Sequence, residues 1–136
     1  MKDGKGITDL QELINNMEPI LNDGEYVFVT VKDSKIISRD IPICEIKEKE
    51  GITLVLPKSD AEDLELSFDF IAAWITLNVH SALEAVGLTA AFATALGDYG
   101  ISCNVIAGYY HDHIFVDVKD KVKAMKVLKE LSSGKD

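Results

Sequence analysis

The sequence predicts an α+β protein built from two related halves, each with a sheet that carries helices on one face. Three observations support this fold class. The hydrophobic period of residues 71–118 changes from that of a strand to that of a helix and back again. Residues 43–56 echo residues 101–118 in their order of strand, turn, strand and helix start. A hydrophobic content of 47% in 136 residues is typical of a packed globular protein.

The first half begins with a helix and a strand. Thr8 and Gln11 form a capping box, in which each residue can satisfy a free backbone amide of the other. An apolar stripe at helical spacing follows over residues 10–17. Residues 22–24, Asn-Asp-Gly, are a strong turn signal, and residues 26–31 are rich in the side chains that favour strands. The pattern predicts a capped helix, a turn and a strand.

A hairpin and a short helix complete the first half. Residues 43–47 and 52–56 are predicted strands on either side of a charged turn. Ser59 and Glu62 form a second capping box, which predicts a helix that begins near Asp60.

The second half carries the clearest periodicity. Residues 68–79 are predicted to be a strand, because apolar and polar side chains alternate in their second part. Residues 88–99 carry a helical apolar stripe, and Gly100 follows where a left-handed cap would end the helix. Residues 101–110 and 113–118 are predicted strands joined by a short turn, and an amphipathic helix forms the C-terminal end.

The halves are predicted to divide at residue 68. Residues 1–68 form the N-terminal half and residues 69–136 the C-terminal half. In the first half a polar segment, residues 32–40, stands where the second half has the helix between its first and second strands. The repeat is therefore one of structure rather than of residues.

Charge and composition exclude several classes of protein. A net charge of −9 argues against nucleic-acid binding and against binding to anionic membranes, because both need clustered Lys and Arg. No run is apolar enough to span a bilayer, and no apolar signal core follows the first lysines. Cys44 and Cys103 lack CxxC spacing, so we expect free thiols in a reducing compartment. We expect a cytoplasmic protein.

The second half resembles the ACT domain, a regulatory module of βαββαβ topology that binds amino acids. The resemblance is carried by Val86-Gly87-Leu88-Thr89-Ala90-Ala91 and by Leu96-Gly97-Asp98-Tyr99-Gly100-Ile101-Ser102-Cys103-Asn104-Val105. Residues 80–89 and 101–113 are also similar to a family of small stand-alone proteins with two ACT-like halves and unknown cellular role. Over residues 25–131 the resemblance implies two tandem ferredoxin-like halves. Glu84-Ala85-Val86 stands where the ACT pattern usually has Asp-Arg-Pro.

A ligand site is predicted where the strand turns into the helix. A glycine at this position lets a ligand approach the backbone, and the free amides of a first helical turn suit a carboxylate. In the ACT family the amino acid lies near this loop and the following strand, often at an interface. The resemblance implicates Ala85, Val86, Gly87 and Leu88 in the loop, and Asn104, Val105 and Ile106 on the strand. Asn104 offers a donor and an acceptor.

A structural role for the same residues is the alternative to ligand binding. Gly87 would then only permit close packing of the helix against a strand, and Asn104 would only satisfy an edge of the sheet.

Three histidines raise the question of a metal site. His111 and His113 lie two residues apart, so they point to one side of an extended segment, and His80 ends a strand nearby in the ACT sheet. Imidazoles suit transition metals, but a closed site needs about four ligands and no Cys or carboxylate completes this set. We interpret His111-Asp112 as a turn, and we expect no metal, no cofactor and no catalytic residue.

The sequence predicts a non-enzymatic regulatory module that binds an amino acid or a similar small carboxylate at a domain or dimer interface. A homodimer is expected, because ACT-like sheets commonly pair. Two alternatives stay open. One is a protein-interaction module without a small ligand, and the other is a minor metal-binding or metal-dependent role of His80, His111 and His113.

Overall fold

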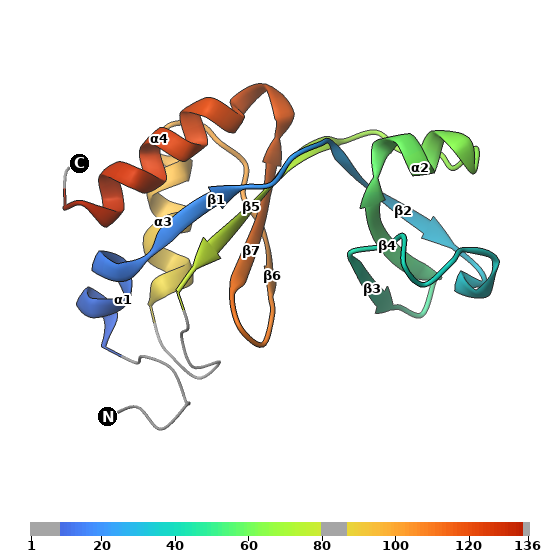
Figure 1. Cartoon of the computed structure of the whole chain (residues 1–136), viewed down its shortest axis with the longest axis horizontal. Helices are drawn as coiled ribbons and strands as arrows, with labels where there is room; N and C mark the ends of the chain where they lie inside the picture. Colours follow the sequence, from blue (N-terminus) through green and yellow to red (C-terminus); the bar gives the residue numbers. More distant parts are fainter. Residues whose placement is uncertain (1–8, 80–86, 135–136) are drawn as a thin grey trace. The chain divides into compact units, whose positions relative to one another are not determined.

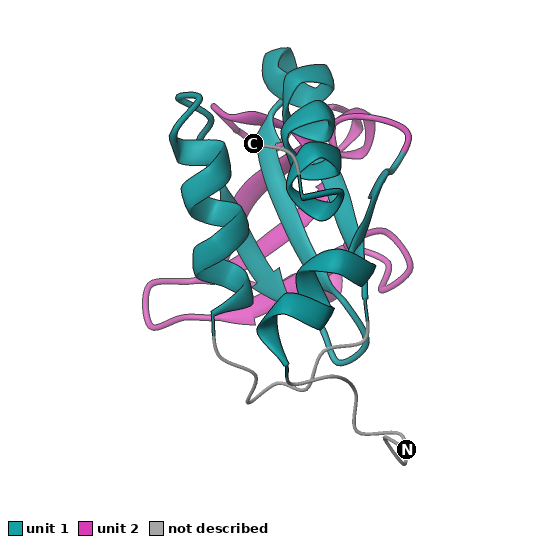
Figure 2. Cartoon of the chain, turned by 90° about the vertical axis from the view of Figure 1, so that its left-hand side faces the viewer, with its two compact units in different colours: residues 1–22, 74–136 teal, residues 23–73 magenta. Residues whose placement is uncertain are grey.

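The computed structural model describes residues 9–79 and 87–134 (Figure 1). Contacts between residues divide the chain into two compact units (Figure 2). Unit 1 comprises residues 1–22 and 74–136, and unit 2 comprises residues 23–73. The chain therefore enters unit 2 after Asn22 and leaves it inside a strand, after Ala73.

Unit 2 is an antiparallel sheet with one helix. The sheet order is β3 (Cys44–Lys47), β4 (Ile52–Pro57), β2 (Tyr26–Val31) and the first residues of β5 (Ile71–Asn78). Every neighbouring pair is antiparallel. Helix α2 (Lys58–Asp63) packs against β2 and β4. The core consists of Val27, Val29, Val31, Ile37, Leu54, Leu56 and Ala61.

Unit 1 is a second sheet with three helices on one of its faces (Figure 2). The sheet order is β1 (Glu18–Leu21), β5, β7 (Asp112–Asp117) and β6 (Asn104–Ala107). The helices are α1 (Leu10–Asn16), α3 (Leu88–Gly97) and α4 (Lys121–Ser132), the last of which follows a 3-10 turn at Val118–Asp120. Among the fully buried side chains of this unit are Leu13, Ile75, Leu77, Phe92, Leu96, Ile114 and Leu128.

Both sheets have the strand order of a ferredoxin-like fold. If the strands of unit 2 are numbered along the chain from β2 to β5, they lie in the order 4-1-3-2 across the sheet. Unit 1 has the same order, counted from β5, with β1 in the fourth position. This arrangement confirms the predicted α+β class and the two tandem halves.

The fourth strand of unit 1 precedes the other three in the chain. β1 pairs with β5, so that Pro19 lies opposite Leu77. Met17, just before β1, is buried, and its carbonyl accepts a hydrogen bond of 2.6 Å from the Ser132 hydroxyl. The predicted division at residue 68 follows the repeat along the chain and stays a prediction, whereas contacts in space group residues 9–22 with the C-terminal residues.

Strand β1 was not predicted from the sequence. Its four residues, Glu-Pro-Ile-Leu, are short for a strand signal and contain a proline. The strand lies at the edge of its sheet, where Pro19 interrupts no ladder on a second side.

The two predicted capping boxes are not the caps of the observed helices. Asp9 caps α1 by accepting a hydrogen bond of 2.9 Å from the amide of Glu12, and Thr8 lies outside the described residues. The predicted box of Ser59 and Glu62 is wrong, because α2 begins at Lys58 and Ser59 lies inside the helix. Lys58 and Glu62 form an ion pair of 3.2 Å instead.

The predicted end of helix α3 is confirmed. Gly100 has a φ of +73°, and the amide of Ile101 donates to the carbonyl of Leu96 at 3.1 Å. A hydrogen bond from the sixth residue back to the first, with a left-handed glycine between them, is the expected way for such a helix to end.

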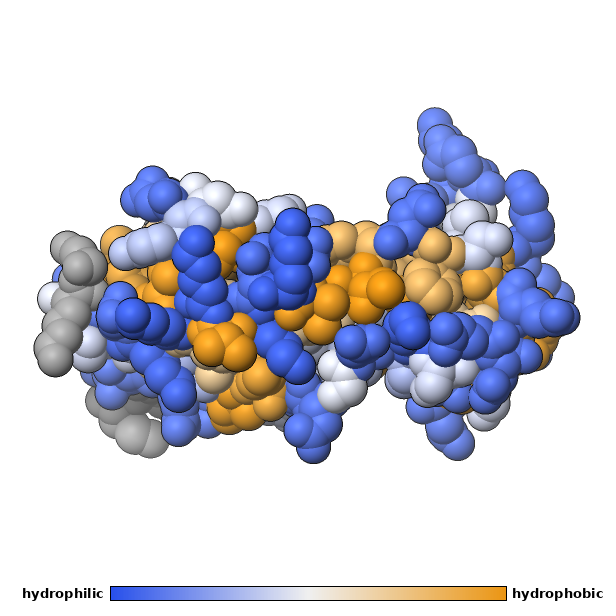
Figure 3. Space-filling view, turned by 90° about the horizontal axis from the view of Figure 1, so that it is seen from above, coloured by the Kyte–Doolittle hydropathy of each residue, from blue (hydrophilic) through white to orange (hydrophobic). Residues whose placement is uncertain are grey.

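Hydrophilic side chains cover most of the face shown in Figure 3, and apolar side chains show between them. Val122 on α4 is 74% exposed, more than any other large apolar side chain that the structure describes. Within the described parts of the chain, no helix combines the length and the apolar character that crossing a membrane requires.

Candidate functional site

The start of α3 depends on a glycine for two separate reasons. Gly87 is the N-cap residue and has a φ of +99°, a conformation that side-chain-bearing residues rarely adopt. A Cβ at this position would also lie 3.0 Å from Cδ2 of Leu10 on α1. Gly87 therefore lets α3 begin in a left-handed conformation while α1 packs closely against the same backbone.

The cap of α3 offers no side chain to the helix amides. Gly87 has no side-chain hydrogen bond to the first turn, whereas Asp9 supplies one at the start of α1. Helix geometry leaves the first amides without partners inside the helix, so an external acceptor can bind them. Leu88, the next residue, is buried. Ala85 and Val86 lie outside the described residues.

The other predicted ligand residues lie on the edge strand β6. Asn104 is exposed, and its side-chain amide donates to the carbonyl of Phe115 at 3.4 Å. Val105 and Ile106 are half-buried opposite Ile114 and His113. Asn104 thus satisfies a carbonyl of the neighbouring strand, as in the alternative that the sequence left open.

The start of α3 and Asn104 do not lie at the same end of unit 1. Figure 1 shows α3 beginning at the end of the unit where β6 and β7 are joined by their turn. Asn104 is the first residue of β6 and lies at the opposite end of that strand. The assignment of a ligand to Gly87, Leu88 and residues 104–106 stays a prediction.

A hydrogen-bonded cluster joins β5, β7 and the residue that follows β1. Nε1 of Trp74 is 3.1 Å from Nδ1 of His113, and Oγ1 of Thr76 is 3.2 Å from the same nitrogen. The side-chain amide of Asn22 donates to Thr76 Oγ1 at 3.0 Å and to the carbonyl of Trp74 at 3.2 Å. The Trp74 ring also stacks on Phe115 at a centroid distance of 6.3 Å.

The cluster determines the protonation of His113. An indole N–H can only donate, so Nδ1 must accept and the proton of neutral His113 must lie on Nε2. Burial lowers the pKa of His113, and the nearby His111 lowers it further. The carboxylate of Asp112 raises this pKa and so opposes both effects. Burial raises the pKa of Asp112, and His113 opposes this shift. His113 is therefore part of a polar network between β5 and β7.

The histidine pair shapes the β6–β7 turn. The amide of Gly108 donates to the carbonyl of His111 at 2.9 Å, and β7 begins at Asp112. The rings of His111 and His113 are 6.4 Å apart, and Nδ1 of His111 is buried without a hydrogen-bond partner. Within residues 9–79 and 87–134, no three His, Cys, Asp or Glu side chains are placed to hold a metal ion. His80 lies outside these ranges.

Both cysteines are free and half-buried. Burial raises the pKa of Cys44, and it raises the pKa of Cys103 to about 11. Because the thiolate is the reactive form, neither side chain has the character of a nucleophile at neutral pH.

Comparison with known proteins connects this architecture to a family. One ACT domain model matches residues 5–73, and a second ACT domain model matches residues 70–130. A search of curated proteins finds no significant match.

Solved structures show the same fold over nearly the whole chain. A Vibrio cholerae protein of unknown function, described as a possible transport protein, is 49% identical, with a TM-score of 0.82 over 90% of this chain and 95% of its own. The regulatory subunit of aspartate kinase from Thermus flavus is 10% identical, with a TM-score of 0.62 over 84% of this chain and 96% of its own. E. coli aspartokinase III is 12% identical, with a TM-score of 0.61 over 85% of this chain and 34% of its own. At such low identity, the two kinase structures support the fold alone.

Proposed function

The chain belongs to the ACT domain family, whose members are regulatory and often bind amino acids, and we propose that it binds an amino acid at the start of α3. The observation that carries the proposal is the cap of this helix. Gly87 itself supplies no side-chain acceptor to the first amides of a ten-residue helix, and the ligand carboxylate would take that role.

Regulation would follow from binding rather than from chemistry. ACT domains are non-catalytic modules, and both cysteines of this chain are held as thiols. An amino acid that binds one arrangement of the protein more tightly than another would shift the population toward it. The protein would therefore act as a sensor that passes ligand occupancy to a partner.

We also propose that the protein is a cytoplasmic homodimer. β6 in unit 1 and β3 in unit 2 each lie at an edge of a sheet, where unpaired backbone groups can join a second copy. Two unpaired thiols suit a reducing compartment. Light scattering of the purified protein tests the assembly, and a monomeric mass at working concentration would refute it.

A thermal-shift panel of amino acids tests the ligand site. A ligand at a hundred times its Kd should stabilise the protein by about 2.7 kcal/mol, which is a measurable rise in Tm. Gly87→Ala should abolish this rise, because a Cβ there is strained and meets Leu10.

Gly100→Ala is the matched control. It introduces the same kind of left-handed strain at the other end of α3, and a Cβ there would meet nothing within 4 Å. We expect it to lower the Tm of the free protein and to leave the ligand response intact. The proposal fails if no amino acid raises the Tm, or if both variants respond to the ligand as the wild type does.

An interaction module without a small ligand is the second candidate. Tyr109 and Tyr110 at the β6–β7 turn are 70% and 66% exposed. Their rings contact each other edge to face, with 5.0 Å between the ring centroids. Exposed tyrosines are enriched where proteins bind one another. A protein partner whose binding is lost in Tyr109→Ser, with no amino acid response, would favour this function.

A further inference from the structure

A hollow of about 780 Å³ lies in unit 2, between strand β3 and the connection that leads into it. Its volume falls within the roughly 300–1,000 Å³ range of small-molecule sites. One wall is formed by the connection, with Lys35, Ile37 and Arg39, and the other by Pro42 and β3. All of these residues belong to unit 2.

The hollow lies where unit 2 lacks a helix that unit 1 has. In unit 1 the connection from β5 to β6 contains the ten-residue helix α3. In unit 2 the corresponding connection, residues 32–43, contains a 3-10 helix of three residues, η1 (Ser34–Ile36). Ile37 attaches this connection to the core, but three of the four residues of β3 stay exposed. The missing helix leaves the side chains of β3 open to a ligand.

Positive charge gathers in this hollow although the chain is strongly acidic. Lys35, Arg39 and Lys47 line it, against one carboxylate, Glu45. The net charge of the chain is −9, and Arg39 is its only arginine. In the part of the chain that the structure describes, none of the three basic side chains forms an ion pair or a hydrogen bond.

This arrangement fits a ligand with two negative charges and a carbon skeleton. A guanidinium group matches the oxygen pairs of carboxylates and phosphates, and a lysine adds a point charge. Ile37, Ile43 and Ile46 supply an apolar part of the lining, and Ile46 is 45% exposed. An amino acid zwitterion carries no net charge and would leave the excess of cations unmatched.

We propose that the hollow between β3 and residues 34–42 is a binding site for a small organic dianion, a phosphate monoester or a dicarboxylate. The site lies in unit 2, so it is separate from the amino acid site proposed at the start of α3 in unit 1. A protein with both sites would combine two kinds of small-molecule signal in one chain.

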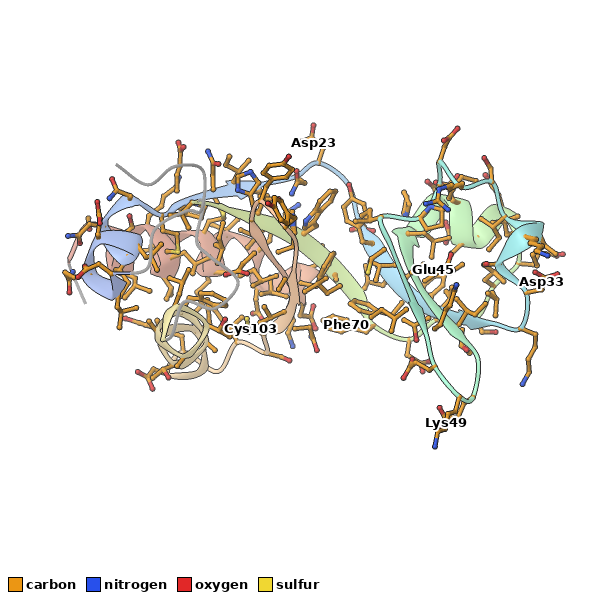
Figure 4. All side chains as sticks on the ribbon, turned by 90° about the horizontal axis from the view of Figure 1, so that it is seen from below. Asp23, Asp33, Glu45, Lys49, Phe70 and Cys103 are labelled. Carbon is orange, nitrogen blue, oxygen red and sulfur yellow. The ribbon has the colours of Figure 1, made fainter. Side chains whose placement is uncertain are left out.

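Calorimetric titration with glycerol 3-phosphate and with succinate, at constant ionic strength, tests the site. We expect saturable binding of at least one of them with one site per chain, and weakening by about ten-fold or more in Arg39→Gln, because a charge-assisted bidentate contact is lost. Lys49→Gln removes the same charge from the same unit. Lys49 lies at the tip of the β3–β4 hairpin, away from Glu45 in the hollow (Figure 4), so this control should bind as the wild type does.

The outcomes separate the alternatives. Binding of only one probe identifies the ligand as a phosphate ester or as a dicarboxylate. The proposal is overturned if neither probe binds, if acetate or glycine binds equally well, or if Arg39→Gln and Lys49→Gln weaken binding equally, since that result means unspecific charge attraction. Circular dichroism monitors folding, and Lys47→Gln replaces Arg39→Gln as the deciding variant if the latter does not fold.

Discussion

At the scale of single residues, the bond between Trp74 and His113 links a spectroscopic probe to a titrating group. Trp74 is the only tryptophan of the chain, and its indole N–H donates to the ring nitrogen that a proton would occupy. Protonation of His113 at Nδ1 would break this hydrogen bond in the folded protein. In the unfolded chain, His113 can be protonated without losing a hydrogen bond to Trp74. The fluorescence of Trp74 should therefore report the charge of His113 directly.

The pKa of His113 gives stability a definite pH dependence. Because the folded-state pKa lies below the ordinary value of 6.5, the unfolded chain binds more protons as the pH falls through 6.5. Stability from His113 is thus complete above about pH 6.5 and is lost on acidification toward the folded-state pKa. The raised pKa of Asp112 acts in the opposite sense, since it favours the folded state at lower pH.

We predict that fluorescence titration of Trp74 has a midpoint below pH 6.5. In His113→Asn the amide oxygen can still accept from Trp74, but the titration should disappear, and urea unfolding should lose the corresponding decrease in stability on acidification below about pH 6.5. The loss of His113 also changes the pKa of Asp112, so the fluorescence of Trp74, which bonds directly to His113, is the signal that assigns the titration. Parallel titration curves for the two proteins would contradict the assignment.

At the scale of elements, α1 is held by its cap and by packing against other helices. Leu13 is fully buried, and α1 contacts both α3 and α4. Because α1 has only seven residues, it cannot be stable by itself and depends on these contacts. Its cap therefore contributes to the stability of the whole of unit 1.

We predict that Asp9→Ala destabilises the protein by about 1 kcal/mol, because the amide of Glu12 loses its acceptor. Asp9→Asn keeps an acceptor oxygen and should cost only a few tenths of a kcal/mol. Urea unfolding followed by far-UV circular dichroism measures both. Equal losses in the two variants would mean that charge at the helix start, rather than the hydrogen bond, stabilises α1.

How far an element could be predicted depended on where its determinants lie. Helix α3, with the left-handed Gly100 after its end, and the β6–β7 hairpin have local signals, namely a stripe, a glycine and a turn, and both were predicted. β1 forms only because β5, more than fifty residues away, supplies its partner. The network of Trp74 and His113 likewise depends on the register between strands, which periodicity alone does not give.

At the scale of the molecule, the fold class and the tandem arrangement followed from the repeated pattern, but the grouping of residues in space did not. A repeat along the chain suggests that each half closes on itself. The structure instead completes unit 1 with a strand from the N-terminal end, so residues 9–22 and the C-terminal helix belong to one core. The candidate site was predicted at Gly87, whereas the hollow beside Arg39 depends on the absence of a helix and has no sequence motif.

We predict that deletion of residues 1–22 disrupts unit 1 and spares unit 2. The deletion removes β1, α1 and the carbonyl that Ser132 binds. Near-UV circular dichroism of Trp74 reports on unit 1, and amide hydrogen exchange in residues 26–57 reports on unit 2. A native Trp74 signal in the truncated protein would show that β1 is dispensable.

The position of β1 also has a consequence for how the chain folds as it is synthesised. Residues 23–73 are contiguous and have their own core, so unit 2 can fold soon after it leaves the ribosome. β1 precedes unit 2 in the chain, yet it pairs with β5 and lies against α4, and so its packing cannot be complete until α4 has emerged. Unit 1 therefore forms after the segment inserted into its sequence has folded, and we expect this long-range step to be the slower of the two.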